Sequence, residues 1–285
     1  MSGWSETWTW IDGAWQGGNP AIAGPRTHAF WQGSSVFDGA RFFDGVMPDL
    51  DLHCQRFNNS AQALYLKPIM REGEILELCA EGVKKFSSDK QLYIKPMYWA
   101  EEDGPGVISC DPESTRFALC LFEAPMAGDD VSMSVTLSPF RRPSIETMPV
   151  NAKAGCLYPN GARAVREAKA RGFDNAVMLD TLGNVAELTA ANIFLVKDGE
   201  VHTPVPNGTF LNGITRQRMI QLLRVAGITV YERTVAYAEL KAADELFSTG
   251  NYNKVVPLNG IEERTMEIGP VSRKARELYF EYAHK

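Results

Sequence analysis

Lys153 lies in the segment MPVNAKAGCLYPNG, residues 148–161, which contains no acidic side chain. Its neighbours are small, apolar or neutral, and such surroundings lower the pKa of a lysine because they desolvate the ammonium. A neutral lysine amine can condense with an aldehyde to form a Schiff base, and small neighbours leave room for a flat ligand beside the backbone. The segment therefore indicates a nucleophilic lysine, with an ordinary surface lysine in a loop as the alternative.

Glu187 lies in the stretch NVAELTAANIF, residues 184–194, where the other side chains are apolar, small or uncharged. A carboxylate buried there must be paired, hydrogen-bonded or functional, because burying it alone is costly. Beside a pyridine ring, Glu187 would keep the ring nitrogen protonated, as an electron-sink cofactor requires. The alternative is that strand alternation points Glu187 to solvent. Asn192 would either orient this carboxylate or close a turn.

Two glycine-containing segments are candidate anion sites. Gly213 precedes a predicted helix whose first turn is Ile214, Thr215 and Arg216, and a helix N-terminus with an exposed hydroxyl binds phosphate readily. Thr215 is equally well placed to be an ordinary helix cap. The loop Ser248 to Asn251 is rich in hydroxyl, amide and glycine, so it either offers backbone amides to an anion or forms only a turn.

These residues are distributed over strands and helices that alternate irregularly along the chain. Asp12-Gly13 and Asp44-Gly45 each predict a tight turn between short strands. The apolar spacing predicts helices over 50–64, 71–86, 160–172, 214–227 and 270–285, and strands over 91–99, 114–124, 131–140, 174–204, 228–235 and 244–250. The mixture favours an α+β fold over a doubly wound parallel sheet.

The chain of 285 residues is long enough for two medium domains rather than one core. The segment PMAGDD, residues 125–130, combines Pro, Gly and acidic residues between two predicted strands, so it is the candidate linker. We therefore expect an N-terminal α/β domain over 1–124 and a C-terminal domain over 131–285.

Composition excludes several classes of function. The formal net charge is −6 and no run is rich in Lys or Arg, which argues against nucleic acid or an anionic membrane as the main partner. We expect no signal peptide and no membrane span, since no stretch approaches the ~20 apolar residues needed. Five scattered cysteines are typical of free thiols in the cytoplasm, and four widely separated histidines give no reason to expect a metal site.

Seven motifs, in family order, resemble class IV (fold type IV) pyridoxal-phosphate aminotransferases of the branched-chain aminotransferase-like superfamily. The resemblance extends from about Trp10 to the C-terminal helix. The motifs are HAFWQGSSVFDGARFF, LHCQRF, LYIKP, NAKAGCLY, GFDNAVMLDTLGNVAELTAANIF, LNGITR and FSTGNYNKV. The resemblance implies a two-domain fold with the active site at the domain interface and a cofactor-binding domain over 131–285.

The resemblance also implies the role of individual residues. Lys153 would bind pyridoxal 5′-phosphate as a Schiff base and then move the proton between substrate Cα and C4′. Glu187 would pair with the pyridine nitrogen, and Tyr158 would hydrogen-bond the ring oxygen. Arg56 would bind the phosphate, Leu211 would pack on one ring face and Asn192 would buttress the ring. Further phosphate contacts would come from the amides of Ile214, Thr215, Gly250 and Asn251 and from the Thr215 hydroxyl.

The predicted substrate pocket departs from the branched-chain pattern at three places. Gln32 replaces a tyrosine, Lys95 in LYIKP replaces an arginine, and Asn251-Tyr252 replaces small residues. Tyr93 remains able to contact a substrate carboxylate, and Lys95 keeps the positive charge without the bidentate fork of arginine. The residues expected to line this pocket are Gln32, Phe37, Gly39, Arg41, Tyr93, Lys95 and Tyr252.

We rank first a ping-pong transaminase that moves an amino group between a branched-chain L-amino acid and a 2-oxo acid such as 2-oxoglutarate. The stretch VFDGARFF is also similar to (R)-selective amine transaminases, so an (R)-amine:pyruvate or mixed-specificity enzyme is the main alternative. A D-amino-acid transaminase, an aminodeoxychorismate lyase and a degenerate binding module follow. The family further implies a homodimer or higher homo-oligomer, with residues 30–35 or 101–107 as candidates to cross the subunit interface.

Overall fold

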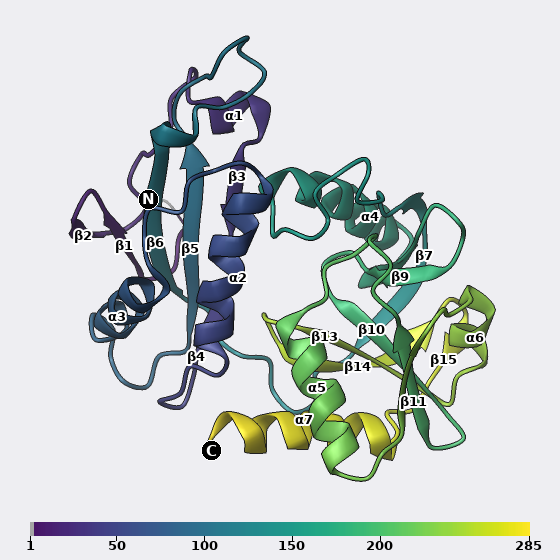
Figure 1. The fold of residues 1–285 in the computed structure, drawn as a ribbon. Coiled ribbons are helices and arrows are strands. Elements are labelled where there is room, and N and C mark those ends of the chain that lie inside the picture. Colours follow the sequence, from purple (N-terminus) through teal and green to yellow (C-terminus); the bar gives the residue numbers. More distant parts are fainter. Residues whose placement is uncertain (1–2) are drawn as a thin grey trace. The chain divides into compact units, whose positions relative to one another are not determined.

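The computed structural model describes residues 3–285, and its contacts divide them into two compact units (Figure 1). The first unit comprises the described residues up to Met126 together with Asn151–Cys156, and the second comprises Ala127–Val150 and Leu157–Lys285. The break after Met126 falls within residues 125–130. The short segment around Lys153 belongs to the first unit, although the chain on both sides of it belongs to the second.

The first unit is built on a six-stranded antiparallel sheet in the order β2-β1-β6-β5-β3, with β4 also paired to β5. Asp12 and Gly13 both have positive φ between β1 and β2, which confirms the predicted hairpin turn. The strands are β1 (Thr7–Ile11), β2 (Ala14–Gly17), β3 (Ser35–Phe37), β4 (Ala40–Phe42), β5 (Leu92–Ala100) and β6 (Thr115–Glu123).

Helices cover one face of this sheet. Leu92, Ile94 and Tyr98 alternate along β5 as buried residues, and Phe57 of α2 stacks on Tyr98 with ring centroids 4.2 Å apart. The intervening side chains of β5 therefore belong to the opposite, half-buried face. The helical elements of this unit are α1 (His28–Gln32), α2 (Leu50–Ala63), α3 (Glu72–Val83) and the 3-10 turn η1 (Pro112–Ser114).

The second unit is built on a nine-stranded mixed sheet in the order β12-β11-β10-β13-β14-β7-β8-β9, with β15 paired to β14. Three of its pairings are parallel: β11 with β12, β14 with β7, and β7 with β8. The strands are β7 (Met133–Arg141), β8 (Asn175–Leu179), β9 (Val185–Leu188), β10 (Asn192–Lys197), β11 (Glu200–Pro204), β12 (Val230–Arg233), β13 (Glu245–Gly250), β14 (Lys254–Ile261) and β15 (Arg264–Thr265).

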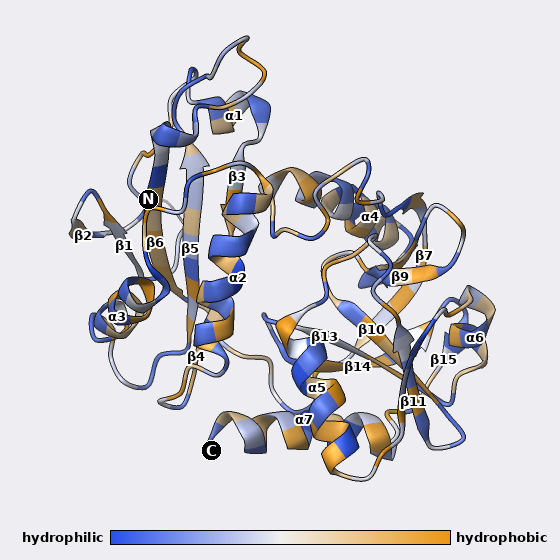
Figure 2. Cartoon of the chain, viewed as in Figure 1, coloured by the Kyte–Doolittle hydropathy of each residue, from blue (hydrophilic) through white to orange (hydrophobic). Residues whose placement is uncertain are grey.

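The helices of the second unit are amphipathic and pack on this sheet. Figure 2 shows hydrophobic and hydrophilic residues alternating along α5 and α7, the pattern of helices with one apolar face. The helices are α4 (Tyr158–Ala170), α5 (Ile214–Val225), α6 (Tyr237–Ala242) and α7 (Pro270–Ala283), and the 3-10 turn η2 spans Gly155–Leu157. Irregular mixing of strands and helices confirms the predicted α+β class.

Within residues 3–285, no helix has the length and apolar character that crossing a bilayer requires. The longest helices, α2 and α7, have 14 residues each, against the ~20 that span a hydrocarbon core.

Candidate active site

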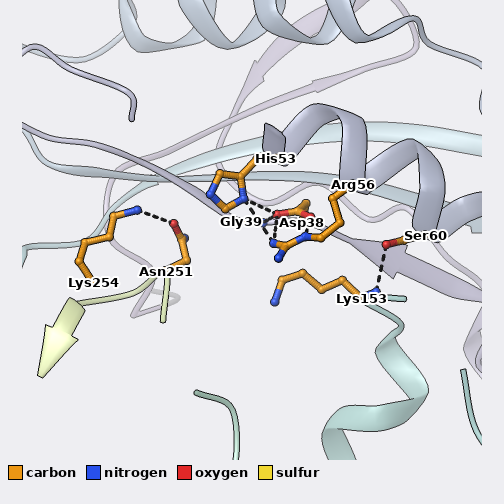
Figure 3. A network of polar contacts seen from close by, with 8 residues as sticks. All are labelled: Asp38, Gly39, His53, Arg56, Ser60, Lys153, Asn251 and Lys254. Carbon is orange, nitrogen blue, oxygen red and sulfur yellow. Dashed lines mark hydrogen bonds and ion pairs between the residues drawn. The ribbon is translucent and has the colours of Figure 1, made fainter. Parts of the chain in front are cut away.

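The backbone of Lys153 is fixed by α2 and β3 of the first unit. Its N–H donates to Ser60 Oγ at 3.0 Å, and its carbonyl accepts from the Phe37 N–H at 3.1 Å (Figure 3). Ala154 continues this contact as an antiparallel bridge to Val36. Both backbone groups of Lys153 are thus bonded, so the position of its Cα is set by elements far away in sequence.

The Lys153 side chain extends over an aromatic ring. Its Nζ lies 4.8 Å from the centroid of the Phe37 ring, and the residue is half-buried. Phe37 pairs with Met97 across β3 and β5, and side chains opposite each other in a sheet share one face. Lys153 therefore extends over the sheet face opposite to that covered by α2 and α3.

A buried carboxylate lies close to this lysine segment. Asp38 Oδ2 accepts from Arg56 Nε and Oδ1 accepts from Arg56 Nη2, each at 2.7 Å (Figure 3). Oδ1 also lies 2.7 Å from His53 Nδ1 and accepts from the Gly39 N–H at 2.7 Å. Burial favours the neutral acid, but the Arg56 and His53 charges and hydrogen bonds together outweigh it and hold the pKa of Asp38 well below its usual range.

The sequence predicted Arg56 as a phosphate ligand but did not identify Asp38 or His53. Arg56 and Ser60 are four residues apart on α2, so they share a helix face, and Ser60 contacts Lys153 directly. Asp38 fixes the guanidinium through a bidentate pair, which uses only part of the five-donor fork. The signal available in the sequence was the three-residue spacing of His53 and Arg56, which places both on one side of a helix.

Four of the predicted substrate residues share the sheet face of Lys153. Arg41 pairs with Tyr93 across β4 and β5, and Tyr93 and Lys95 alternate with the buried residues of β5. Tyr93 stacks on Phe122 at 5.2 Å, and Lys95 Nζ lies 5.8 Å from the centroid of the same ring. Phe37, two residues before Gly39, completes this set.

Arg41 differs from the others because its side chain is fully buried, at 0% exposure. Its Nη2 donates to the Ala124 carbonyl, and its guanidinium lies 6.0 Å from the centroid of the Tyr93 ring. We therefore interpret Arg41 as a support for Tyr93. Gln32 is exposed at the C-terminal end of α1, and Gly39 is buried between β3 and β4.

In the second unit, Glu187 is buried rather than solvent-facing, so the alternative based on strand alternation is wrong. It is 6% exposed on β9 and its Oε1 lies 3.2 Å from Arg142 Nε. Its Oε2 accepts from Asn192 Nδ2 at 3.3 Å. The sequence did not identify Arg142, which is far from this carboxylate along the chain.

Asn192 links three segments of the second unit. Besides Glu187, its Nδ2 donates to the Leu211 carbonyl at 3.0 Å, so the amide nitrogen has two acceptors. Asn192 also pairs with Thr249 across β10 and β13. A Cβ at Gly213 would lie 2.4 Å from Asn192 Oδ1, so any larger residue there would displace the Asn192 amide. Asn192 thus does more than close a turn, because it holds the segment before α5 against the end of β13.

The helix α5 begins as predicted. Gly213 is its N-cap and Ile214 and Thr215 are its first two residues, both buried, so the interpretation of Thr215 as the cap is wrong. The first N–H groups of an α-helix have no acceptor within the helix. The N-terminus of α5 therefore offers main-chain donors beside a threonine hydroxyl, a combination suited to an anion.

The end of β13 and the turn after it contain buried polar atoms with no partner among residues 3–285. These atoms are Thr249 Oγ1 and Asn251 Nδ2. On the other side of the same amide, Asn251 Oδ1 accepts from Lys254 Nζ at 2.8 Å (Figure 3). A buried N–H group without an acceptor is rare in proteins. The donors of this turn and of α5 therefore fit a phosphate group.

The remaining predicted residues border these elements. Tyr158 is the first residue of α4, and it is partly exposed. Tyr252 is exposed in the turn between β13 and β14, and Gly250 ends β13. Leu211 is half-buried just before α5.

Comparison with known proteins gives consistent matches over nearly the whole chain. Residues 35–261 match the family described as amino-transferase class IV. A probable branched-chain-amino-acid aminotransferase from Aquifex aeolicus is 32% identical over 267 residues, which covers 89% of this chain and 85% of the relative.

Two solved structures are similar in both sequence and fold. An aminotransferase from Brucella abortus bound to the cofactor PLP has a TM-score of 0.97 and 54% identity, covering 98% of this chain and 100% of that one. The T.th. branched-chain amino acid aminotransferase complexed with N-(5′-phosphopyridoxyl)-L-glutamate has a TM-score of 0.89 and 29% identity, covering 100% and 96%.

Proposed function

The chain belongs to the class IV aminotransferase family, and from this premise we propose that it is a pyridoxal-phosphate-dependent transaminase of the branched-chain-amino-acid type. The predicted family and fold type are confirmed by the family match and by the similar solved structures. The proposed residue roles rest on one observation: the backbone of Lys153, within the matched segment, is hydrogen-bonded to Ser60 and Phe37.

Pyridoxal phosphate supplies an aldehyde that condenses with amines and a pyridine ring that accepts electrons from the substrate Cα. Lys153 Nζ would bind the cofactor covalently and, once the substrate amine displaces it, carry the proton between substrate Cα and C4′. The Phe37 ring lies 4.8 Å from Nζ and would keep water from that side of the amine.

Glu187 would accept a hydrogen bond from the protonated pyridine nitrogen. Arg142 and Asn192 hold its carboxylate and balance its charge, so it can remain ionised in a buried position. Leu211, whose carbonyl Asn192 holds, would pack on the ring, and Tyr158 would donate to the ring oxygen.

The phosphate would be bound by donors only. We propose that Arg56, oriented by Asp38, binds it together with the main-chain N–H groups of Ile214 and Thr215. The Thr215 hydroxyl and the N–H groups of Gly250 and Asn251 would complete the set. Asp38, the carboxylate next to this set, would not repel the anion, because its oxygens already accept four hydrogen bonds.

For the substrates, we propose a branched-chain L-amino acid as the donor and 2-oxoglutarate as the acceptor. The Aquifex aeolicus relative is named as a branched-chain enzyme, and the T.th. structure contains a phosphopyridoxyl adduct of L-glutamate. Tyr93 and Lys95, on the sheet face of Lys153, would bind the substrate carboxylate. These features favour amino and 2-oxo acids over simple amines.

A second candidate is an (R)-amine:pyruvate or mixed-specificity transaminase. A lysine ammonium cannot bind a carboxylate in the bidentate manner of arginine, so Lys95 would make carboxylate recognition less stringent. Tyr252 adds a large exposed ring beside the phosphate-binding turn. A donor panel decides between the candidates: L-leucine, L-alanine, D-alanine and both enantiomers of 1-phenylethylamine, each with pyruvate and with 2-oxoglutarate. We expect the highest rate with L-leucine and 2-oxoglutarate; activity confined to the (R)-amine would overturn this choice.

We further propose a homodimer or higher homo-oligomer in the cytoplasm. Phe30, Trp31, Val107 and Ile108 are exposed apolar side chains of the first unit. His28 Nε2 lies 3.2 Å from the Ile108 carbonyl, which connects α1 to the loop that contains Val107 and Ile108. The five cysteines form no disulfide among the described residues, as is usual in a reducing compartment. Light scattering on the purified protein measures the assembly, and a monomer would contradict this proposal.

A further inference from the structure

Lys254 is a buried lysine with no role in the function proposed above. It is 1% exposed, at the first position of β14, and its φ of 61° is in the left-handed region. Lysine is rarely buried to this extent unless its ammonium is paired. Its Nζ donates to Asn251 Oδ1 at 2.8 Å and lies 5.6 Å from the centroid of the Tyr279 ring on α7.

The contact with Lys254 determines how the Asn251 amide is oriented. An ammonium has three donors and no acceptor, so it must face the amide oxygen rather than the amide nitrogen. Asn251 Nδ2 then faces the other way, where it is buried and has no acceptor among residues 3–285. A donor left in this state destabilises the protein unless a ligand supplies an acceptor.

A second observation points to the same ligand. Thr249 Oγ1, two residues earlier on strand β13, is also buried without a partner among residues 3–285, and Thr249 is 1% exposed. Thr249 pairs with Asn192, which in turn holds the segment before α5. The turn and the N-terminus of α5 therefore belong to one group of donors within the second unit.

We propose, on the basis of the transaminase function above, that Lys254 is a positioning residue for the cofactor phosphate. It turns the Asn251 amide so that Nδ2 donates to a phosphate oxygen, and it adds a positive charge to the donors of the second unit. The ligand is a phosphate monoester dianion, which needs charge compensation when it is desolvated. Lys254 acts through Asn251 and through its charge, and it does not contact the reacting atoms.

The alternative role for Lys254 is purely structural, as an aliphatic stem packed against Tyr279. The two roles differ in what happens to ligands with and without a phosphate. A structural defect would weaken the binding of pyridoxal 5′-phosphate and of pyridoxal alike, because Lys153 and Glu187 are proposed to contact the part that the two ligands share. Loss of a phosphate contact would weaken only pyridoxal 5′-phosphate.

The test compares apo-protein variants by titration with pyridoxal 5′-phosphate and with pyridoxal, followed by the absorption of the bound aldehyde. We expect Lys254→Met to lower pyridoxal 5′-phosphate affinity roughly tenfold and leave pyridoxal affinity unchanged. Asn251→Ala should have a similar effect, and the double variant should lose little more than either single one, because both changes remove the same contact. Lys274→Met, an exposed lysine on α7, is the matched control and should have no effect.

Lys254→Gln separates the orientation of the Asn251 amide from the positive charge of Lys254. This variant also tests the proposal if Lys254→Met does not fold. Its side-chain amide still donates to Asn251 Oδ1 but has no charge, so we expect an affinity between those of the wild type and Lys254→Met. Unchanged pyridoxal 5′-phosphate affinity, equal losses for both ligands, or additive losses in the double variant would overturn the proposal. If the wild-type protein bound neither aldehyde, the transaminase function itself would fail, which is a different result.

Discussion

Two groups of polar residues satisfy their hydrogen bonds differently. The first, in the first unit, is the cluster around Asp38 and Lys153; the second, in the second unit, is the donor group formed by Thr249, Asn251 and the N-terminus of α5. In the first, Asp38 accepts from Gly39, His53 and Arg56, so a buried charge is compensated within the protein. In the second unit, Glu187 is compensated by Arg142, but two buried polar atoms at residues 249 and 251 have no partner among residues 3–285. The buried carboxylate of the first cluster is therefore compensated without a ligand, whereas the two unpaired atoms of the second unit require one.

This contrast predicts different consequences of mutation. Changes at Lys153 should affect covalent chemistry and changes at Asp38 should affect folding, whereas Arg56 of the same cluster is proposed to contact the phosphate as well. Changes in the donor group of the second unit should affect cofactor affinity, since its donors bond to the ligand rather than to the protein.

The largest expected effect is that of Lys153→Ala. Removing the amine removes both the covalent attachment and the proton carrier, so we expect turnover to fall by at least about 10⁴-fold. The backbone contacts of residue 153 to Ser60 and Phe37 remain, so thermal unfolding should be nearly unchanged. Steady-state transamination and thermal melts measure the two effects, with Lys169→Ala on α4 as the control. Full activity of Lys153→Ala would refute the assignment.

The second prediction concerns Asp38→Asn and stability. Removing the carboxylate takes away the bidentate ion pair of the partly buried Arg56, which we expect to cost about 3–5 kcal/mol in the free energy of unfolding. Because the pKa of Asp38 is lower in the folded state than in the unfolded state, its contribution is complete above the unfolded value and is lost as the pH falls toward the folded value.

Chemical denaturation of the wild type and of Asp38→Asn at several pH values checks this. The difference between them should be largest near neutral pH and shrink at pH values below about 4. Asp51→Asn, at an exposed position on α2, is the control. A difference that grew on acidification would show that Asp38 is not the compensated charge described here.

The third and smallest effect is expected from Glu187→Gln. A neutral amide cannot stabilise a protonated pyridine nitrogen, so we expect the half-reaction with the amino donor to slow by about 10²-fold. Cofactor affinity should change little, because the phosphate donors are untouched, in contrast to Lys254→Met. Stopped-flow measurement of the half-reaction and an equilibrium titration separate rate from affinity. If Glu187→Gln lowered cofactor affinity without slowing the half-reaction, the role assigned to Glu187 would be wrong.

Local signals in the sequence predicted most of the elements that position these residues. The Asp12-Gly13 turn, the helix that carries Arg56 and the start of α5 after Gly213 are as predicted. Each depends on neighbours in sequence, such as a turn pair, an apolar repeat or a helix start, and such patterns are visible without tertiary contacts.

The sequence did not predict features that depend on distant partners. The strand β14 contains Pro257, which weakens a strand pattern, and it forms because β13 and β7 flank it. The pairing of Arg142 with Glu187 and the burial of Lys254 arise only from tertiary packing. Asp38 resembles an ordinary turn residue next to Gly39 until α2 places Arg56 and His53 against it.

The proposed function depends above all on Lys153 as the residue that binds the cofactor covalently. The most direct measurement is reduction of the protein loaded with pyridoxal 5′-phosphate by borohydride, which makes the lysine–cofactor bond permanent, followed by peptide mass mapping. We expect a phosphopyridoxyl mass on the peptide that contains Lys153 and on no other lysine peptide. The same mass on a different lysine, with Lys153 unmodified, would contradict it.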